Sequence, residues 1–189
     1  MSRLQIVKYP AVVLRKKAVT VERVTPELQE FFADMAELMY ESRGVGLAAP
    51  QVGISLRIIV VDTDDKLQTI INPKITHAEG SQTGVEGCLS LPGLHGDVTC
   101  AESVTVRGLN RFGKKITLSG DGLWARAIQH EVDHLDGRLF IDRVDTSTLR
   151  WVTGQTDEDG ESIERPTTLE EAKIIFERQA EIEKEKITA

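Results

Sequence analysis

Residues 123–135 read LWARAIQHEVDHL, and they form the centre of a helix that is predicted to begin near Asp121 and to end at Gly137. At about 100° per residue, these side chains form an apolar stripe, a polar edge and, between the two, a face that carries two histidines. His130 and His134 lie one turn apart on this face, so both imidazoles can hold one metal ion. A single histidine there would more often be a hydrogen-bonded core residue, but a pair at this spacing with Glu131 after the first is rare by chance. The segment therefore predicts a metal site that is enclosed by protein and reached from a pocket.

The third metal ligand decides which kind of site this is. Two histidines leave a tetrahedral cation one protein ligand short if a water molecule is to keep the fourth position. In metzincin proteases a third histidine follows six residues after the second, but Phe140 stands there in this chain. A thermolysin-like site needs a downstream glutamate, and the candidates Glu161 and Glu164 lie in a charged region that is typical of the periphery. Upstream, Cys88 follows Gly87, and its thiolate would complete a Cys-His-His set.

The composition indicates one globular domain. The chain has 189 residues, of which 40% are hydrophobic and 28% charged. Its 30 acidic and 23 basic residues give a net charge of −7, which argues against duplex nucleic-acid binding, because neutralising phosphates needs the opposite charge. No apolar run approaches the ~20 residues that cross a bilayer, so we expect a cytoplasmic protein without membrane insertion. The two cysteines are too few for a disulfide framework.

The other elements follow from spacing, caps and turn residues. A helix should begin after Thr25 and stop near Gly44, because apolar residues recur at helical spacing between them. Strands are predicted over residues 56–61, 69–75, 103–109 and 115–118, and a further pair, 149–153 and 162–165, across the acidic turn 157–160. Residues 80–96 hold five glycines and indicate a shaped loop or irregular strand. A capping box at Thr168 and Glu171 opens a last, peripheral helix.

Three segments closely match, in order and spacing, the signature motifs of the peptide deformylases. They read GVGLAAPQ at residues 44–51, EGCLS at 86–90 and QHEVDHL at 129–135. The chain resembles this family over about residues 3–144. Together with the elements above, the resemblance implies an α+β fold. In it, antiparallel β-sheets pack around a central metal-binding helix, with an N-terminal helix and a C-terminal extension of a hairpin and a helix.

The resemblance also implies the reaction and its metal. The metal ligands would be Cys88, His130 and His134, and Glu131 would be catalytic. The implied cofactor is one divalent metal ion, Fe²⁺ in the cell, with Zn²⁺, Ni²⁺ and Co²⁺ as alternatives. The implied activity is removal of the formyl group from the initiator formyl-methionine of nascent polypeptides, with release of formate. A small zinc endopeptidase that uses the same helix is the alternative.

Further residues are assigned to the transition state and to the substrate. The resemblance implies that the Gln51 amide and the backbone N–H of Leu89 stabilise the negative charge that develops on the carbonyl oxygen. Val45, Leu123 and Ala127 are the predicted pocket for the methionine side chain, although ordinary core packing would also account for them. The backbone of Val45, together with that of Gly46 and Gly87, would pair with the extended substrate as an added strand.

The partners of two acidic residues next to the site can also be predicted. Glu86 would orient a metal-bound histidine through its free ring nitrogen. Many relatives carry a Pro-Arg pair where this chain has Thr99 and Cys100, and that arginine would be a natural partner for Asp133. We therefore expect Asp133 to be solvated or paired with another arginine, for which the candidates are Arg126, Arg107 and Arg57. Cys100 and the histidines His77 and His95 are expected to lie outside the metal site, with His95 near the substrate.

Residues 1–145 are expected to form the deformylase-like catalytic domain, and residues 146–189 a C-terminal extension. Packing on the domain, a dimer contact and a transient ribosome contact are the alternatives for this extension. The expected partners are formyl-Met nascent peptides, without specific DNA binding, and a monomer is the favoured oligomeric state.

Overall fold

A computed structural model describes residues 4–156 and 162–188 of the chain. The described α-helices are α1 (Pro26–Glu41), α2 (Gly122–Leu135) and α3 (Leu169–Thr188). Short 3-10 helices span Val12–Arg15, Ala49–Val52, Phe140–Asp142 and Thr146–Thr148. The strands are β1 (Gly46–Ala48), β2 (Ile58–Val61), β3 (Gln68–Glu79), β4 (Gln82–Cys88), β5 (Leu91–Cys100), β6 (Ser103–Leu109), β7 (Lys115–Asp121), β8 (Arg150–Thr156) and β9 (Ser162–Pro166).

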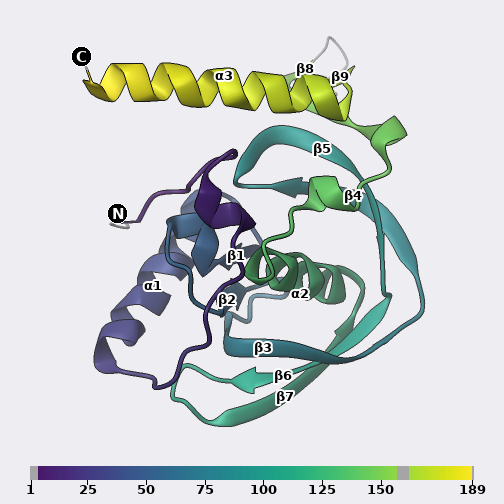
Figure 1. Ribbon diagram of the computed structural model, residues 1–189. Helices are drawn as coiled ribbons and strands as arrows, with labels where there is room; N and C mark the ends of the chain where they lie inside the picture. The colour runs from purple at the N-terminus through teal and green to yellow at the C-terminus, as the bar shows by residue number, and fades with distance from the viewer. Residues whose placement is uncertain (1–3, 157–161, 189) are drawn as a thin grey trace.

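The strands form two antiparallel sheets, and α2 lies between them in Figure 1. The order of the five-stranded sheet is β1-β2-β3-β6-β7, and that of the four-stranded sheet is β4-β5-β8-β9. Strands β1 and β4 are therefore edge strands, each with one side not paired within its own sheet. This confirms the predicted α+β class, with antiparallel sheets around the helix that carries the histidines.

Helix α2 lies where its apolar stripe packs on the five-stranded sheet. Ala125, Ile128 and Leu135 are fully buried in one cluster with Ile59 and Ile70 of strands β2 and β3. The helix ends at Leu135, two residues before the predicted end at Gly137, which has a φ of 73°, a conformation that favours glycine. Because the stripe fixes the rotation of the helix, the adjoining face with the histidines points toward the four-stranded sheet.

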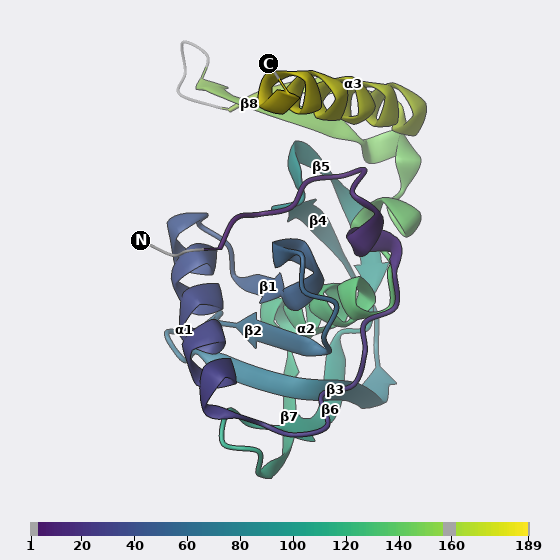
Figure 2. The same cartoon turned by 60° about the vertical axis from the view of Figure 1, so that its left-hand side comes forward.

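Helix α1 covers another part of the five-stranded sheet, as Figure 2 shows from the side. Its buried residues Phe32, Met35 and Met39 pack against Ile58 and Val60 of β2. The helix begins at Pro26, and its end at Glu41 lies close to the predicted stop at Gly44. The chain then passes directly into β1, so the end of α1 sets the position of that edge strand.

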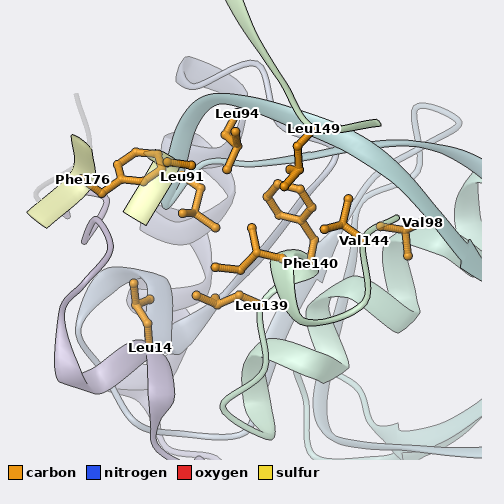
Figure 3. Packing of buried hydrophobic residues seen from close by; sticks show 11 residues of the cluster. Leu14, Leu91, Leu94, Val98, Leu139, Phe140, Val144, Leu149 and Phe176 are labelled. Carbon is orange, nitrogen blue, oxygen red and sulfur yellow. The ribbon is translucent and has the colours of Figure 1, made fainter. Parts of the chain in front are cut away.

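A third apolar cluster joins the C-terminal segment to the rest of the protein (Figure 3). Leu149 and, on α3, Phe176 are buried with Leu91 and Leu94 of β5. The predicted capping box at the start of α3 is present: the backbone N–H of Thr168 donates to Glu171 Oε2 at 3.0 Å, and that of Glu171 donates to Thr168 Oγ1 at 3.2 Å. The described helices include none long and apolar enough to cross a bilayer.

The glycine-rich segment 80–96 is more regular than the sequence indicates. It forms most of the β4–β5 hairpin, with Gln82 opposite Cys100 and Gly87 opposite His95. Glycine serves close packing here, because a Cβ atom on Gly87 would lie 2.7 Å from His95 Nε2 and one on Gly96 would lie 2.5 Å from Val144 Cγ2. The other predicted strands are observed, including the pairing of β8 with β9, while the acidic turn 157–160 lies outside the described residues.

Candidate metal centre

Two elements bring three metal-ligating side chains together. Helix α2 supplies His130 and His134, and the end of β4 supplies Cys88. One donor atom from each lies within 4.8 Å of the other two. The Cys88 Sγ atom is 3.2 Å from His134 Nε2. A thiolate and two imidazoles are ligands that borderline divalent cations prefer, and three protein ligands leave a position for water or substrate.

The surroundings of the two histidines fit a bound cation. His134 is only 1% exposed, and burial together with the neighbouring His130 holds its pKa well below the ordinary value, so its ring is neutral as a metal ligand must be. Burial would also lower the pKa of His130, but Cys88 and Glu86 outweigh it and raise that pKa well above the ordinary value. Cation binding at these donors therefore displaces a proton.

Glu86 holds the ring of His130 from the side away from the other donors. Its Oε2 atom lies 2.8 Å from His130 Nδ1, which leaves Nε2 for a cation. Its other carboxylate oxygen accepts a hydrogen bond of 2.7 Å from Arg126, which is 7% exposed. Burial raises the pKa of Glu86, but His130 and Arg126 outweigh it and hold the pKa below the ordinary value. The Glu86 side chain is therefore ionised and held at both oxygens.

Glu131 is buried beside the donors and lacks a partner for one oxygen. It is 4% exposed, and its Oε2 atom has no hydrogen-bond partner among the described residues. Burial raises its pKa to about 7. Gly46 of β1 lies against it, because a Cβ atom there would be 2.4 Å from Glu131 Oε1. A buried, unpartnered carboxyl with a pKa near neutrality is suited to accept and return a proton.

Gln51 presents its amide nitrogen to the same site. The backbone N–H of Ala48 donates to Gln51 Oε1 at 2.8 Å, which turns Nε2 toward Cys88 Sγ at 3.5 Å and Ser90 Oγ at 3.4 Å. The contact with Ser90 Oγ is long for a hydrogen bond and sulfur is a weak acceptor, so the amide remains available to a better acceptor. Leu89 follows Cys88 at the start of the turn between β4 and β5.

A cavity of about 450 Å³ opens onto these groups. Cys88, His130 and Glu131 line it, whereas His134 lies behind them. The structure also places around this cavity every residue that the sequence analysis assigns to substrate or to the oxyanion, namely Val45, Gly46, Gln51, Gly87, Leu89, Leu123 and Ala127. His95, expected near the substrate, lines it as well.

The prediction of an arginine partner for Asp133 named the wrong arginines. Asp133 pairs with Arg143, whose Nε lies 2.8 Å from Oδ2, and Arg138 lies 3.9 Å away. Arg126 binds Glu86 instead, and Arg57 binds Asp136. The turn at Gly137 reverses the chain after α2 and returns Arg143 to the helix end, a contact that helical spacing does not reveal.

The competing third ligands lie elsewhere. Phe140 is buried in the cluster of Figure 3, Glu164 of β9 pairs with Arg150 at 2.9 Å, and Glu161 lies outside the described residues. Cys100 is buried at the end of β5 and is not one of the grouped donors. The donor set therefore has a cysteine in the third place and differs from those of metzincins and thermolysin-like proteases.

Comparison with known proteins agrees with this donor set. The family model of polypeptide deformylases matches residues 3–150. A peptide deformylase of Symbiobacterium thermophilum is 48% identical over 184 residues, covering 96% of this chain and 81% of that protein. One of Thermodesulfovibrio yellowstonii is 50% identical over 149 residues, covering 76% and 90%. The crystal structure of the Thermotoga maritima peptide deformylase superimposes with a TM-score of 0.75 at 37% identity, covering 77% of this chain and 99% of that one.

The matched region contains all the residues that meet in the cavity. A Cys-His-His donor group, a buried glutamate beside it and similarity over most of the chain lead to one assignment: the chain belongs to the polypeptide deformylase family.

Proposed function

We infer that the chain is a metal-dependent hydrolase that removes the formyl group from the initiator formyl-methionine of nascent polypeptides and releases formate. The observation that carries this inference is the meeting of Cys88, His130 and His134 beside the buried, unpartnered carboxyl of Glu131. The donor group can bind the cation, and the carboxyl can move the protons that amide hydrolysis requires.

The three donors would hold one divalent cation. Such a cation lowers the pKa of a water molecule and polarises a carbonyl group, which is the chemistry that formamide hydrolysis needs. We propose Fe²⁺ as the metal in the cell, following the family resemblance. The donor set of one thiolate and two imidazoles also accepts Zn²⁺, Ni²⁺ and Co²⁺, among which availability decides.

Glu131 would act first as base and then as acid. With a pKa near 7 it can take the proton of the attacking water and return it to the departing amine, which becomes the free N-terminus of the methionine. Gly46 makes this possible, because any side chain there would displace the carboxyl. One carboxylate thus serves both proton transfers.

Negative charge develops on the formyl oxygen as water adds to the carbon. The Gln51 amide is held by Ala48 with its nitrogen toward the site, so it can donate to that oxygen without first turning. The backbone N–H of Leu89, next to Cys88, is the second donor in this proposal. Losing one such donor typically raises a barrier by ~3 kcal/mol.

The peptide would lie between two sheet edges. The cavity is lined by β1 and β4, which are the edge strands of the two sheets. An extended peptide can pair with the backbone of such an edge as an added strand. Leu123 and Ala127 lie on the α2 face that carries the histidines and offer apolar contact for an unbranched methionine side chain.

Formate release tests the proposed function. Protein loaded with Fe²⁺ without oxygen is expected to release formate from formyl-Met-Ala-Ser. Glu131→Gln keeps the three donors and should bind the cation, while turnover falls by roughly 10²–10⁴-fold. Glu79→Gln, at the exposed end of β3, is the matched control and should retain wild-type turnover. Deformylation by Glu131→Gln near the wild-type rate would refute the role of this carboxyl.

We also propose that residues 1–145 form the catalytic unit and residues 146–189 an extension packed on it. Support comes from the cavity, whose lining residues lie between 43 and 131, and from the burial of Ala172 and Phe176 in the cluster of Figure 3. A transient ribosome contact of the extension and a monomeric state stay predictions.

A further inference from the structure

Arg43 occupies a position that normally belongs to glycine. Helix α1 ends with two reverse hydrogen bonds: the N–H of Gly44 donates to Met39 O and the N–H of Arg43 donates to Tyr40 O, both at 2.9 Å. This is the Schellman arrangement, in which the residue after the helix cap takes a left-handed conformation. Arg43 has a φ of 56° there. An arginine at this point is strained, and such strain is commonly retained where a side chain has a task.

The Arg43 side chain lies at the mouth of the cavity without a counterion. It is exposed and lines the cavity, and it has no ion-pair partner among the described residues. Three other acidic or basic side chains line the cavity, apart from histidines: Glu86, Arg126 and Glu131. All three are buried or nearly so, and Glu86 and Arg126 neutralise each other. Arg43 is therefore the exposed fixed charge that a bound peptide meets.

The layout of β1 sets the direction in which a peptide must run. Gly46 lies against Glu131, so the reacting end of the peptide belongs beside Gly46. Beyond it, Leu47 and Ala48 are fully buried, and no peptide can continue that way. In the other direction Val45 and Arg43 are exposed. Arg43 stands three positions before Gly46, so an extended peptide that runs antiparallel to β1 with its formyl group beside Gly46 has its third residue nearest Arg43.

We propose that Arg43 is a specificity-determining residue that favours formylated peptides with a carboxylate side chain at the third position. The proposal rests on the proposed function, because it concerns the peptide being deformylated. A guanidinium and a carboxylate attract by charge and by paired hydrogen bonds. Arg43 does not reach the reacting atoms, so the preference belongs in KM and leaves kcat unaltered.

The size of the effect follows from exposure. Exposed ion pairs are weak, so an aspartate peptide should exceed a lysine peptide in kcat/KM by roughly three- to tenfold, counting attraction of one and repulsion of the other. The net charge of −7 would by itself give the opposite order, since a negative protein attracts cationic peptides. A preference for the aspartate peptide would therefore come from a charge close to the peptide, and not from the net charge of the protein.

The test compares three amidated peptides, formyl-Met-Ala-Asp-Ser, formyl-Met-Ala-Lys-Ser and formyl-Met-Ala-Gln-Ser, on the metal-loaded protein. For the wild type we expect the aspartate-to-lysine ratio of kcat/KM to exceed one, with the difference in KM. Arg43→Glu should invert the ratio. Arg43→Gly, which suits the left-handed position and should fold, should abolish the preference. Arg107→Glu on β6, which faces solvent outside the cavity, makes the same change in net charge and should leave the ratio unaltered.

The outcomes separate this proposal from the function on which it rests. If the wild type does not deformylate the glutamine peptide, the proposed function fails, and the preference fails with it. If the wild type deformylates that peptide but Arg43→Glu and Arg43→Gly keep its aspartate-to-lysine ratio, the preference alone is overturned. An equal change in the ratio for Arg107→Glu would also overturn it, because the net charge would then be responsible.

Discussion

The Oε2 atom of Glu86 lies 2.8 Å from Nδ1 of His130, and this contact fixes which nitrogen of the ring faces the cavity. The same carboxylate is held by Arg126, which also donates to the backbone oxygen of Val98 at 2.9 Å. Arg126 and His130 lie one turn apart on α2. Helix α2 therefore carries both the metal ligand His130 and the arginine that holds Glu86, the hydrogen-bond partner of that ligand.

Removing the Arg126 guanidinium should weaken metal binding. In Arg126→Met the nearly buried Glu86 carboxylate loses its counterion and the His130 ring loses a fixed support. We expect the affinity for a divalent cation to fall by about 10–100-fold, measured by competition with a chelator of known affinity. Arg143→Met is the matched control, since it breaks the pair with Asp133 outside the cavity. Equal losses in both variants would contradict a specific role for Arg126.

Replacing Cys88 should abolish thiolate ligation and activity, whereas replacing Cys100 should not. Cys88→Ala removes the thiolate donor, so the Co²⁺-loaded protein should lose its sulfur-to-cobalt absorption band and its deformylase activity. Cys100→Ala removes a buried sulfur from outside the donor group and should retain both. If the cobalt spectrum of Cys88→Ala still shows a thiolate ligand, the assignment of Cys88 as the third ligand is wrong.

The stability of the metal-free protein should depend on pH through Glu131. Burial raises the pKa of this carboxyl to about 7 from an ordinary 4.5, so the folded protein binds the proton more tightly than the unfolded chain. Its contribution to the unfolding free energy is therefore fully present below pH 4.5 and is lost as the pH rises to about 7. At ~1.4 kcal/mol per pH unit, the loss is about 3 kcal/mol.

Urea unfolding of metal-free protein across this pH range measures that contribution. Relative to the wild type, Glu131→Gln should become more stable as the pH rises, by about 3 kcal/mol in total. The exposed Glu79→Gln should follow the wild type. If the difference between Glu131→Gln and the wild type stays constant from pH 4.5 to pH 8, the raised pKa is wrong.

Replacing Arg43 by glycine should stabilise the protein. The left-handed conformation is unfavourable for arginine and open to glycine, so Arg43→Gly should raise the unfolding free energy by about 1 kcal/mol and Tm by roughly 2–4 °C. Calorimetry measures the change. Arg107→Gly, in the middle of strand β6, should instead lower Tm, because glycine weakens a strand. A lower Tm for Arg43→Gly would show that the position is not strained.

Local patterns predicted the helices and most strands, because caps and apolar spacing are properties of neighbouring residues. The two histidines and Glu131 could be placed for the same reason, since one helical turn determines their geometry. Cys88 is different. Its position 42 residues before His130 carries no geometric information, and it became a strong candidate only through the resemblance of its segment to a known motif.

Contacts across the fold were the part that the sequence did not reveal. Arg126 could have been paired with Asp133 or with Glu86, and only the β4 edge lying against α2 decides for Glu86. Arg143 reaches Asp133 through a turn after the helix, and the left-handed backbone of Arg43 follows from the way α1 passes into β1. The glycines of β4 and β5 indicated a shaped loop or an irregular strand, and not a regular hairpin, because their packing partners, such as Val144, are distant in sequence.

Strand β1 has a further consequence for the behaviour of the protein in a crowded cell. An unpaired strand edge is also a template for self-association, which proteins commonly limit by keeping such edges short. β1 spans only Gly46–Ala48, and the chain leaves it at once through the turn of Ala49–Val52. Another sheet would find too few free backbone groups there to pair stably. Because β1 is short and only its Gly46 end lines the cavity, it can contact a passing peptide and still resist aggregation.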